Sequence, residues 1–163
     1  MKQVASRRSS PRSRSKGTRR KSSRRLSTPR LPRAAVASPE TPVDPRLREG
    51  VDRFNARQFF ECHEILEQLW LQTAGRSKHF YQGLIQAAVA FHHWSKGNPA
   101  GALTLARSAT GYLKRYTPAY LGLDVEAFLQ RFGDVFQWLR RHPMRYDPRL
   151  VPVLRWTPMA RQQ

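Results

Sequence analysis

The most informative segment of the sequence is residues 58–70, Gln-Phe-Phe-Glu-Cys-His-Glu-Ile-Leu-Glu-Gln-Leu-Trp. At about 100° per residue, five of its apolar side chains fall on one arc of a helix. These are Cys62, Ile65, Leu66, Leu69 and Trp70. His63 lies at the rim of this arc, one turn from Glu67, while Glu61 flanks the opposite rim and Glu64 points toward solvent. The segment therefore predicts an amphipathic helix with a polar edge, extending to about residue 73.

Start and stop signals on both sides of this segment predict four more helices. Asp44-Pro45 combines an N-cap with a proline at the first helical position, so a helix is expected over about 46–56. Gly75 and Ser77 are expected to end one helix and to cap the next, over about 78–96. Asn98-Pro99 predicts a helix over about 100–116, and Asp124 predicts one that reaches about residue 140.

The pattern predicts an all-α protein, a compact bundle of two helical hairpins plus a C-terminal helix, over residues 44–142. Leu47, Val51 and Phe54 of the first helix and Phe128, Phe132 and Leu139 of the last are expected to point inward. After Pro143, three further prolines (Pro148, Pro152 and Pro158) disfavour a long helix. Residues 143–163 are therefore expected to form an extended strap with Trp156 packed on the bundle.

The positive charge is concentrated at the N-terminus. Residues 1–33 hold 13 of the 30 Lys and Arg residues and no acidic residue, which leaves 17 basic against all 11 acidic residues elsewhere. A segment with so little to bury is expected to be disordered over residues 1–43 and to attract polyanions, including nucleic acid. Its anion-contacting candidates are Arg7, Arg8, Arg12, Arg14, Arg19, Arg20, Lys21, Arg24 and Arg25. A solubilising extension without a specific partner is the alternative.

A polar row interrupts the predicted helix over residues 78–96, whose other faces are largely apolar. The row consists of Gln82, Gln86 and His93, with Gly83 and Ala90 beside it. An unpaired buried polar group costs about 1–3 kcal/mol, so these side chains need hydrogen-bond partners. The expected partners are Glu61, His63, Glu64 and Glu67, and Gly83 and Ala90 are expected to let a neighbouring helix approach.

Several separated motifs carry a family resemblance. They are Phe59-Phe60-Glu61-x-His63-Glu64-x-x-Glu67-x-x-Trp70, Tyr81-Gln82-Gly83-Leu84-Ile85-Gln86, His93 with Gly97-Asn98, Gly101-Ala102 and Gly122-x-Asp124-Val125. In this order and spacing they resemble the bacterial DUF309 family, over about residues 46–140. The resemblance implies a compact all-helical domain and implies no reaction. It leaves the Arg/Ser-rich N-terminus and the Pro-rich C-terminus unexplained.

The polar cluster allows three interpretations. A structural Glu–His–Gln network or small ligand pocket is the first. A metal site is the second, with His63, Glu67 and His93 as ligands and Glu64 and Gln86 beside them. The spacing differs from a zincin, because Glu67 stands where the second His belongs, and from a di-iron bundle, which needs two Glu-x-x-His elements. A glutamate acting as general base is the third, but no nucleophile or oxyanion donor accompanies it.

The sequence as a whole indicates a binding or interaction module that carries this cluster, with no cofactor predicted. A metal-dependent or hydrolase-type enzyme and a nucleic-acid-associated protein acting through the basic tail are the alternatives. The lone Cys62 excludes an intrachain disulfide, and its spacing predicts a small buried residue. No apolar run approaches the roughly 18 residues of a membrane span. A cytoplasmic location is expected, with organellar targeting by the N-terminus as a minor alternative.

Overall fold

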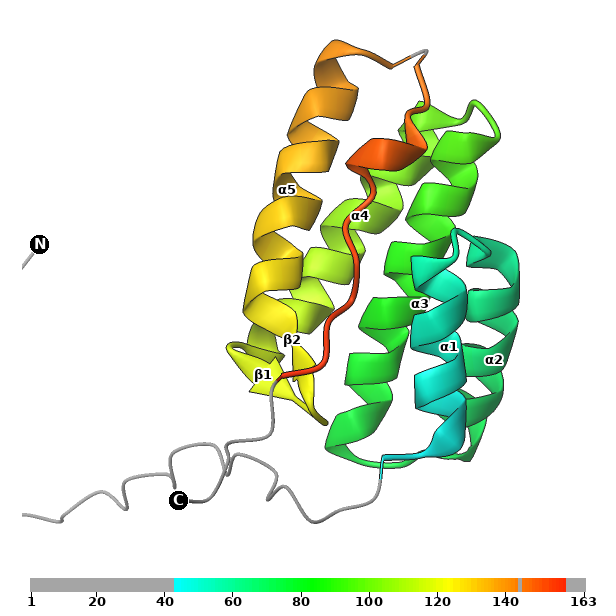
Figure 1. Cartoon of the computed structure of the whole chain (residues 1–163), viewed down its shortest axis with the longest axis vertical. Helices are drawn as coiled ribbons and strands as arrows, with labels where there is room; N and C mark the ends of the chain where they lie inside the picture. The colour runs from blue at the N-terminus through cyan, green and yellow to red at the C-terminus, as the bar shows by residue number, and fades with distance from the viewer. Residues whose placement is uncertain (1–42, 144, 158–163) are drawn as a thin grey trace, which may run out of the picture. The chain divides into compact units, whose positions relative to one another are not determined.

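The structure, a computed structural model, describes residues 43–143 and 145–157. Five helices account for most of this part, which confirms the all-α class (Figure 1). They are α1 (Pro45–Asn55), α2 (Phe59–Gln72), α3 (Arg76–Ser95), α4 (Pro99–Leu113) and α5 (Val125–Arg141). The predicted disorder of the basic N-terminal segment concerns residues that lie, apart from Val43, outside the described part.

The helix starts follow from local capping. Asp44 accepts a hydrogen bond from the Arg46 amide at 2.9 Å, Asn98 from Gly101 at 2.9 Å and Asp124 from Ala127 at 2.9 Å. Each bond satisfies one amide that a helix N-terminus leaves unpaired. The predicted caps at Asp44, Asn98 and Asp124 are therefore confirmed.

Two predicted boundaries of α3 and α4 are wrong. Gly75 has a φ of +69° and turns the chain directly into α3 at Arg76, so Ser77 lies inside the helix and does not cap it. The Ser77 hydroxyl instead bonds to the hydroxyl of Tyr120 at 2.8 Å. Helix α4 ends at Leu113, three residues early, because the chain tightens into the 3-10 turn η1 (Lys114–Tyr116).

Phe54 marks the centre of the apolar core. Its ring meets those of Phe59, Phe91 and Phe128 edge to face, at centroid distances of 5.5, 5.8 and 5.7 Å. These rings come from α1, α2, α3 and α5, so one aromatic cluster joins four helices. The inward residues predicted for the first and last helices are all buried.

Two short strands, β1 (Ala119–Tyr120) and β2 (Leu123–Asp124), connect α4 to α5. No strand is predicted for this connection from the sequence. Leu121 and Gly122 both have positive φ, of 47° and 79°, as a tight hairpin turn of this kind requires.

The C-terminal strap, described here over residues 145–157, crosses the bundle as an extended segment after the 3-10 turn η2 (Pro148–Leu150) (Figure 1). Asn55 at the end of α1 exchanges two hydrogen bonds with the backbone of Leu154, at 2.9 and 2.8 Å. Trp156 forms a bridge with Leu123 of β2 and is partly buried against the core. The expected strap packing is confirmed.

Candidate functional site

Helix α2 buries one face and exposes another. Phe59, Cys62, Leu66 and Leu69 are at most 3% exposed and pack against α1 and α3. Burial raises the pKa of the Cys62 thiol to about 12, which keeps it protonated and unreactive at neutral pH. The prediction of a small, buried, structural cysteine is consistent with this placement.

The polar residues predicted on α2 lie at its surface. Glu61, Glu64 and Glu67 are exposed, and His63 is 27% exposed. His63 Nε2 lies 3.7 Å from Glu67 Oε2, one turn along the same helix. This is an i, i+4 pair at a solvent-accessible edge, a geometry that contributes only a few tenths of a kcal/mol to a helix.

The polar row of α3 borders α4 as well as α2. A Cβ placed on Gly83 would lie 2.7 Å from Leu113 Cγ, so the close approach that Gly83 permits is made by α4. His93 Nδ1 lies 3.1 Å from Asn98 Nδ2, at the cap of α4. Gln82 and Gln86 are half-buried, and Gln86 Oε1 is a buried acceptor without a hydrogen-bond partner in the described part of the chain.

The predicted hydrogen bonds between the two halves of the cluster do not form. Within the described residues, no hydrogen bond joins the 61–67 side chains to Gln82, Gln86 or His93. The physical reason is that the exposed edge of α2 points its carboxylates to water, which solvates them better than a helix interface can. The functional role of these residues stays a prediction.

A hollow of about 130 Å³ lies between α2 and α3, next to this cluster. It is lined by Phe59, Phe60, His63, Val89 and His92. The Phe60 ring lies 6.0 Å from the His63 ring and 5.8 Å from the His92 ring. The hollow thus has apolar walls with two imidazoles at its edge.

Phe60 and His92 are not among the site residues predicted from the sequence. His92 is half-buried and lines the hollow. Burial lowers the pKa of His92, and the charges of Lys96, His93 and His63 lower it further. The sequence does contain a signal for His92. Val89 and His92 are three residues apart, so their side chains lie one turn apart on the same side of α3.

The exposed face of α2 carries an unusual stripe of residues, Phe60, Glu64, Glu67 and Leu71. Their spacings of four, three and four residues place them in one row along the helix. Phe60 is 51% exposed and Leu71 is 65% exposed, and these are the large apolar side chains exposed among the described residues. Two carboxylates thus lie between two exposed apolar side chains, and we call this row the α2 stripe.

Of the residues predicted as metal ligands, only His63 and Glu67 lie close to each other. Across residues 43–143 and 145–157, no group of three or more His, Cys, Asp or Glu side chains gathers closely enough to hold an ion. The metal hypothesis therefore rests on His63 and Glu67 alone, with His93 engaged by Asn98.

Residues 47–105, from α1 into α4, match the family model of DUF309, described as a domain of unknown function. This part of the chain is similar to the DUF309 family. This confirms the resemblance drawn from the motifs of α2 and α3. The Gly122-x-Asp124-Val125 motif lies beyond the matched residues.

Two curated bacterial proteins are similar to the chain. The uncharacterized protein YpuF of Bacillus subtilis is 37% identical over 84 residues, which cover 50% of this chain and 48% of that protein. An uncharacterized protein of Aquifex aeolicus is 38% identical over 88 residues, 52% of this chain and 26% of that protein. The matched region thus spans about half of one relative and about a quarter of the other.

The described helices also bear on membrane insertion. None of the helices in the described part of the chain combines the length and apolar character of a membrane span. The nine anion-contacting candidates between Arg7 and Arg25 lie outside the described residues, and their role stays a prediction.

Proposed function

We propose that the helical domain of this chain is a binding module and that the α2 stripe is its binding surface. The observation that carries the proposal is the exposure of Phe60 and Leu71 at the two ends of one helical row. Large apolar side chains aligned on an outer helix face are characteristic of a docking surface, whereas single exposed apolar residues are ordinary.

The charge of α2 defines the chemistry of the partner. Within Phe59–Gln72 there are three glutamates and no Lys or Arg, although the whole chain has a formal net charge of +19. Glu64 and Glu67 lie between the two apolar ends of the stripe. A complementary partner is therefore a cationic amphipathic segment, with Lys or Arg at its centre and an apolar side chain at each end.

The length of the stripe sets the length of the partner. Phe60 and Leu71 are eleven positions apart, which corresponds to about 16 Å along a helix. A partner helix would present matching apolar residues three turns apart. One of these apolar side chains would enter the hollow beside Phe60, between the rings of His63 and His92.

The proposal is tested with a fluorescent synthetic helical peptide that has two leucines eleven residues apart and two arginines between them. Binding to the full chain is measured by anisotropy. Phe60→Ala is expected to weaken binding about tenfold, because it removes one of the two apolar contacts at the ends of the stripe. Glu64→Lys with Glu67→Lys is expected to weaken it further, because like charges then oppose each other.

Glu126→Lys provides the matched control, since Glu126 is also exposed on a helix but lies on α5. It produces half the charge change of the double variant, of the same sign and away from the α2 stripe, so it should leave peptide binding within about twofold. Equal weakening by Glu126→Lys, or no effect of Phe60→Ala, would show that the peptide senses net charge and would refute the proposal.

A further inference from the structure

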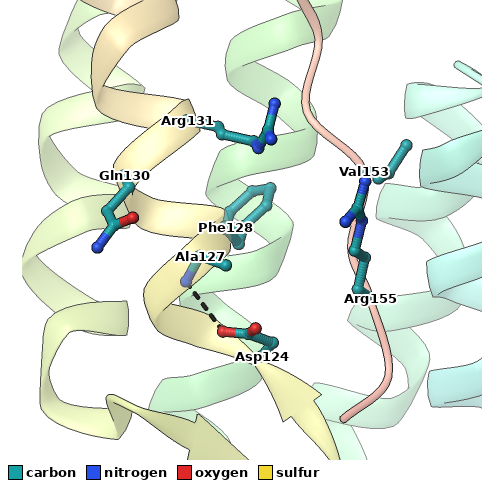
Figure 2. A pocket seen from close by; sticks show the side chains of 7 residues that line it. All are labelled: Asp124, Ala127, Phe128, Gln130, Arg131, Val153 and Arg155. Carbon is teal, nitrogen blue, oxygen red and sulfur yellow. Dashed lines mark hydrogen bonds between the residues drawn. The ribbon is translucent and has the colours of Figure 1, made fainter. Parts of the chain in front are cut away.

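A second hollow, of about 170 Å³, lies between the start of α5 and the C-terminal strap. Asp124 lines it from the end of β2, Phe128 and Arg131 line it from α5, and Val153 and Arg155 line it from the strap (Figure 2). It shares no lining residue with the hollow beside Phe60, so an inference drawn from it is independent of the proposed peptide surface.

The strap is fixed on both sides of this hollow. The Asp124 amide donates to the Arg155 carbonyl at 2.9 Å, and the Leu154 amide donates to Asn55 at 2.8 Å. Arg131 extends from α5 toward the strap, and Arg155 extends along the strap, so the two side chains face the same space from different elements (Figure 2). The backbone thus holds α5 and the strap on two sides of one hollow, and each contributes one exposed arginine to its lining.

The charges lining the hollow are not balanced. Arg131 and Arg155 have no ion pair or side-chain hydrogen bond within the described residues, unlike Arg46 and Arg149, which pair with aspartates at 2.8 Å. The acidic group of the lining is Asp124, and its carboxylate already accepts from the Ala127 amide at 2.9 Å. Two cations against one capped carboxylate leave the hollow positive.

The donors available to a ligand are the arginines rather than the helix N-terminus. The amides of Val125 and Glu126 bond to the Pro118 carbonyl at 3.0 Å, and the Ala127 amide bonds to Asp124. A ligand therefore meets guanidinium forks, whose paired N–H groups match the oxygens of a phosphate. Phe128, which is buried, also lines the hollow, whereas Arg131 and Arg155 are exposed and therefore accessible to a ligand from solvent.

We propose that Arg131 and Arg155 bind the phosphate group of a small molecule in this hollow. The size of the hollow supports a single phosphate, because drug-sized ligands usually occupy pockets of about 300–1,000 Å³. A phosphate offers enough acceptor oxygens to take hydrogen bonds from both arginines at once, one from α5 and one from the strap.

The test is an NMR titration of the isotope-labelled full chain with inorganic phosphate, at ionic strength held constant with chloride. The amide signals of Ala127, Arg131 and Arg155 are expected to shift and saturate together with one dissociation constant. Arg131→Gln and Arg155→Gln are each expected to raise that constant about tenfold, because each removes a charge-assisted contact. Arg131→Lys keeps the charge without the fork and should give an intermediate loss.

Arg140→Gln is the matched control, because it removes the same charge from an exposed position on the same helix. It should leave the dissociation constant within about twofold. Shifts that do not saturate, shifts confined to residues 1–33, or an equal loss in Arg140→Gln would each overturn the site.

A parallel titration with glycerol phosphate separates two sources of the ligand. Tighter binding than that of inorganic phosphate assigns the site to phosphomonoesters, and equal or weaker binding assigns it to free phosphate. Acetate at the same concentration should produce no saturating shift; a carboxylate that binds as well as phosphate would refute phosphate selectivity.

Discussion

At the scale of single residues, Gly83 is a position where the packing of α3 on α4 leaves no room for a side chain. A Cβ there would lie 2.7 Å from Leu113 Cγ and 3.1 Å from Tyr112 Cβ, and Leu113 is fully buried. Leu113 cannot move aside without disturbing the core. Glycine is therefore required at Gly83 for space, since its φ is not positive.

We predict that Gly83→Ala destabilises the domain, by roughly 1 kcal/mol or more after the helix-propensity gain of alanine is subtracted. Gly111 in α4 gives the contrasting case, because a Cβ there would meet nothing within 4 Å. Gly111→Ala should stabilise the domain by about 0.5–1 kcal/mol. Urea unfolding followed by circular dichroism measures both changes. Equal stability of the two variants would contradict the close contact between α3 and α4.

At the scale of elements, the C-terminal strap depends on Asn55. This side chain both donates to and accepts from the backbone of Leu154, and Leu154 is only 4% exposed. Removing the amide leaves a buried N–H and a buried C=O without partners. A buried polar group without a partner costs the full free energy of its desolvation. The two hydrogen bonds to Asn55 therefore hold the strap in place together with the burial of its apolar side chains.

We therefore predict that Asn55→Ala lowers the free energy of unfolding by about 1–3 kcal/mol and speeds hydrogen exchange at the Leu154 amide. Exchange in the middle of α3 should change less, because the strap can open without the helices. Gln137→Ala, at an exposed position of α5, is the control and should be neutral within about 0.5 kcal/mol. Unchanged protection at Leu154 would show that the strap does not depend on this contact.

The same scale shows which features the sequence could predict. The caps at Asp44, Asn98 and Asp124 were predictable because each hydrogen bond closes within two or three residues. The start of α3 was not, because Gly75 takes up a positive φ and begins the helix before Ser77. Side-chain capping thus determines the starts of α1, α4 and α5, whereas the positive φ of Gly75 determines the start of α3.

The candidate sites depended on non-local arrangement and were predicted less well. The polar row of α3 was identified, but whether it meets α2 or α4 depends on which helix packs on Gly83. The sequence places Phe60 on a helix, but its exposure of 51% depends on how α2 packs on its neighbours. Arg131 and Arg155 are far apart in sequence and line one hollow only because the strap returns to the start of α5.

At the scale of the whole molecule, the charge distribution separates two modes of binding. Residues 1–33 carry 13 basic residues and no acid, whereas α2 carries three glutamates and no basic residue. The first composition attracts polyanions over long distances, and the second favours a cationic segment at short range. We propose that the chain uses these two surfaces for different partners.

The last prediction concerns polyanion binding by the full chain, measured with a DNA duplex as probe across a range of salt concentrations. A plot of log affinity against log salt concentration has a negative slope. If the N-terminal segment provides the contacts, the magnitude of this slope should decrease by about 0.9 for each phosphate contact that is lost. Changing five clustered tail residues to Gln should therefore flatten the slope. These are Arg19, Arg20, Lys21, Arg24 and Arg25.

A matched variant changes five exposed basic residues of the helical domain to Gln, namely Arg107, Lys114, Arg115, Arg140 and Arg141. Both variants lose the same net charge, so any difference between them reports where the DNA is held. The tail variant should show the flatter slope, because the slope counts the phosphates that bound cations neutralise, and these cations are proposed to lie in the N-terminal segment. Equal slopes would mean that net charge alone governs binding, and a flatter slope in the domain variant would place the polyanion on the helices instead.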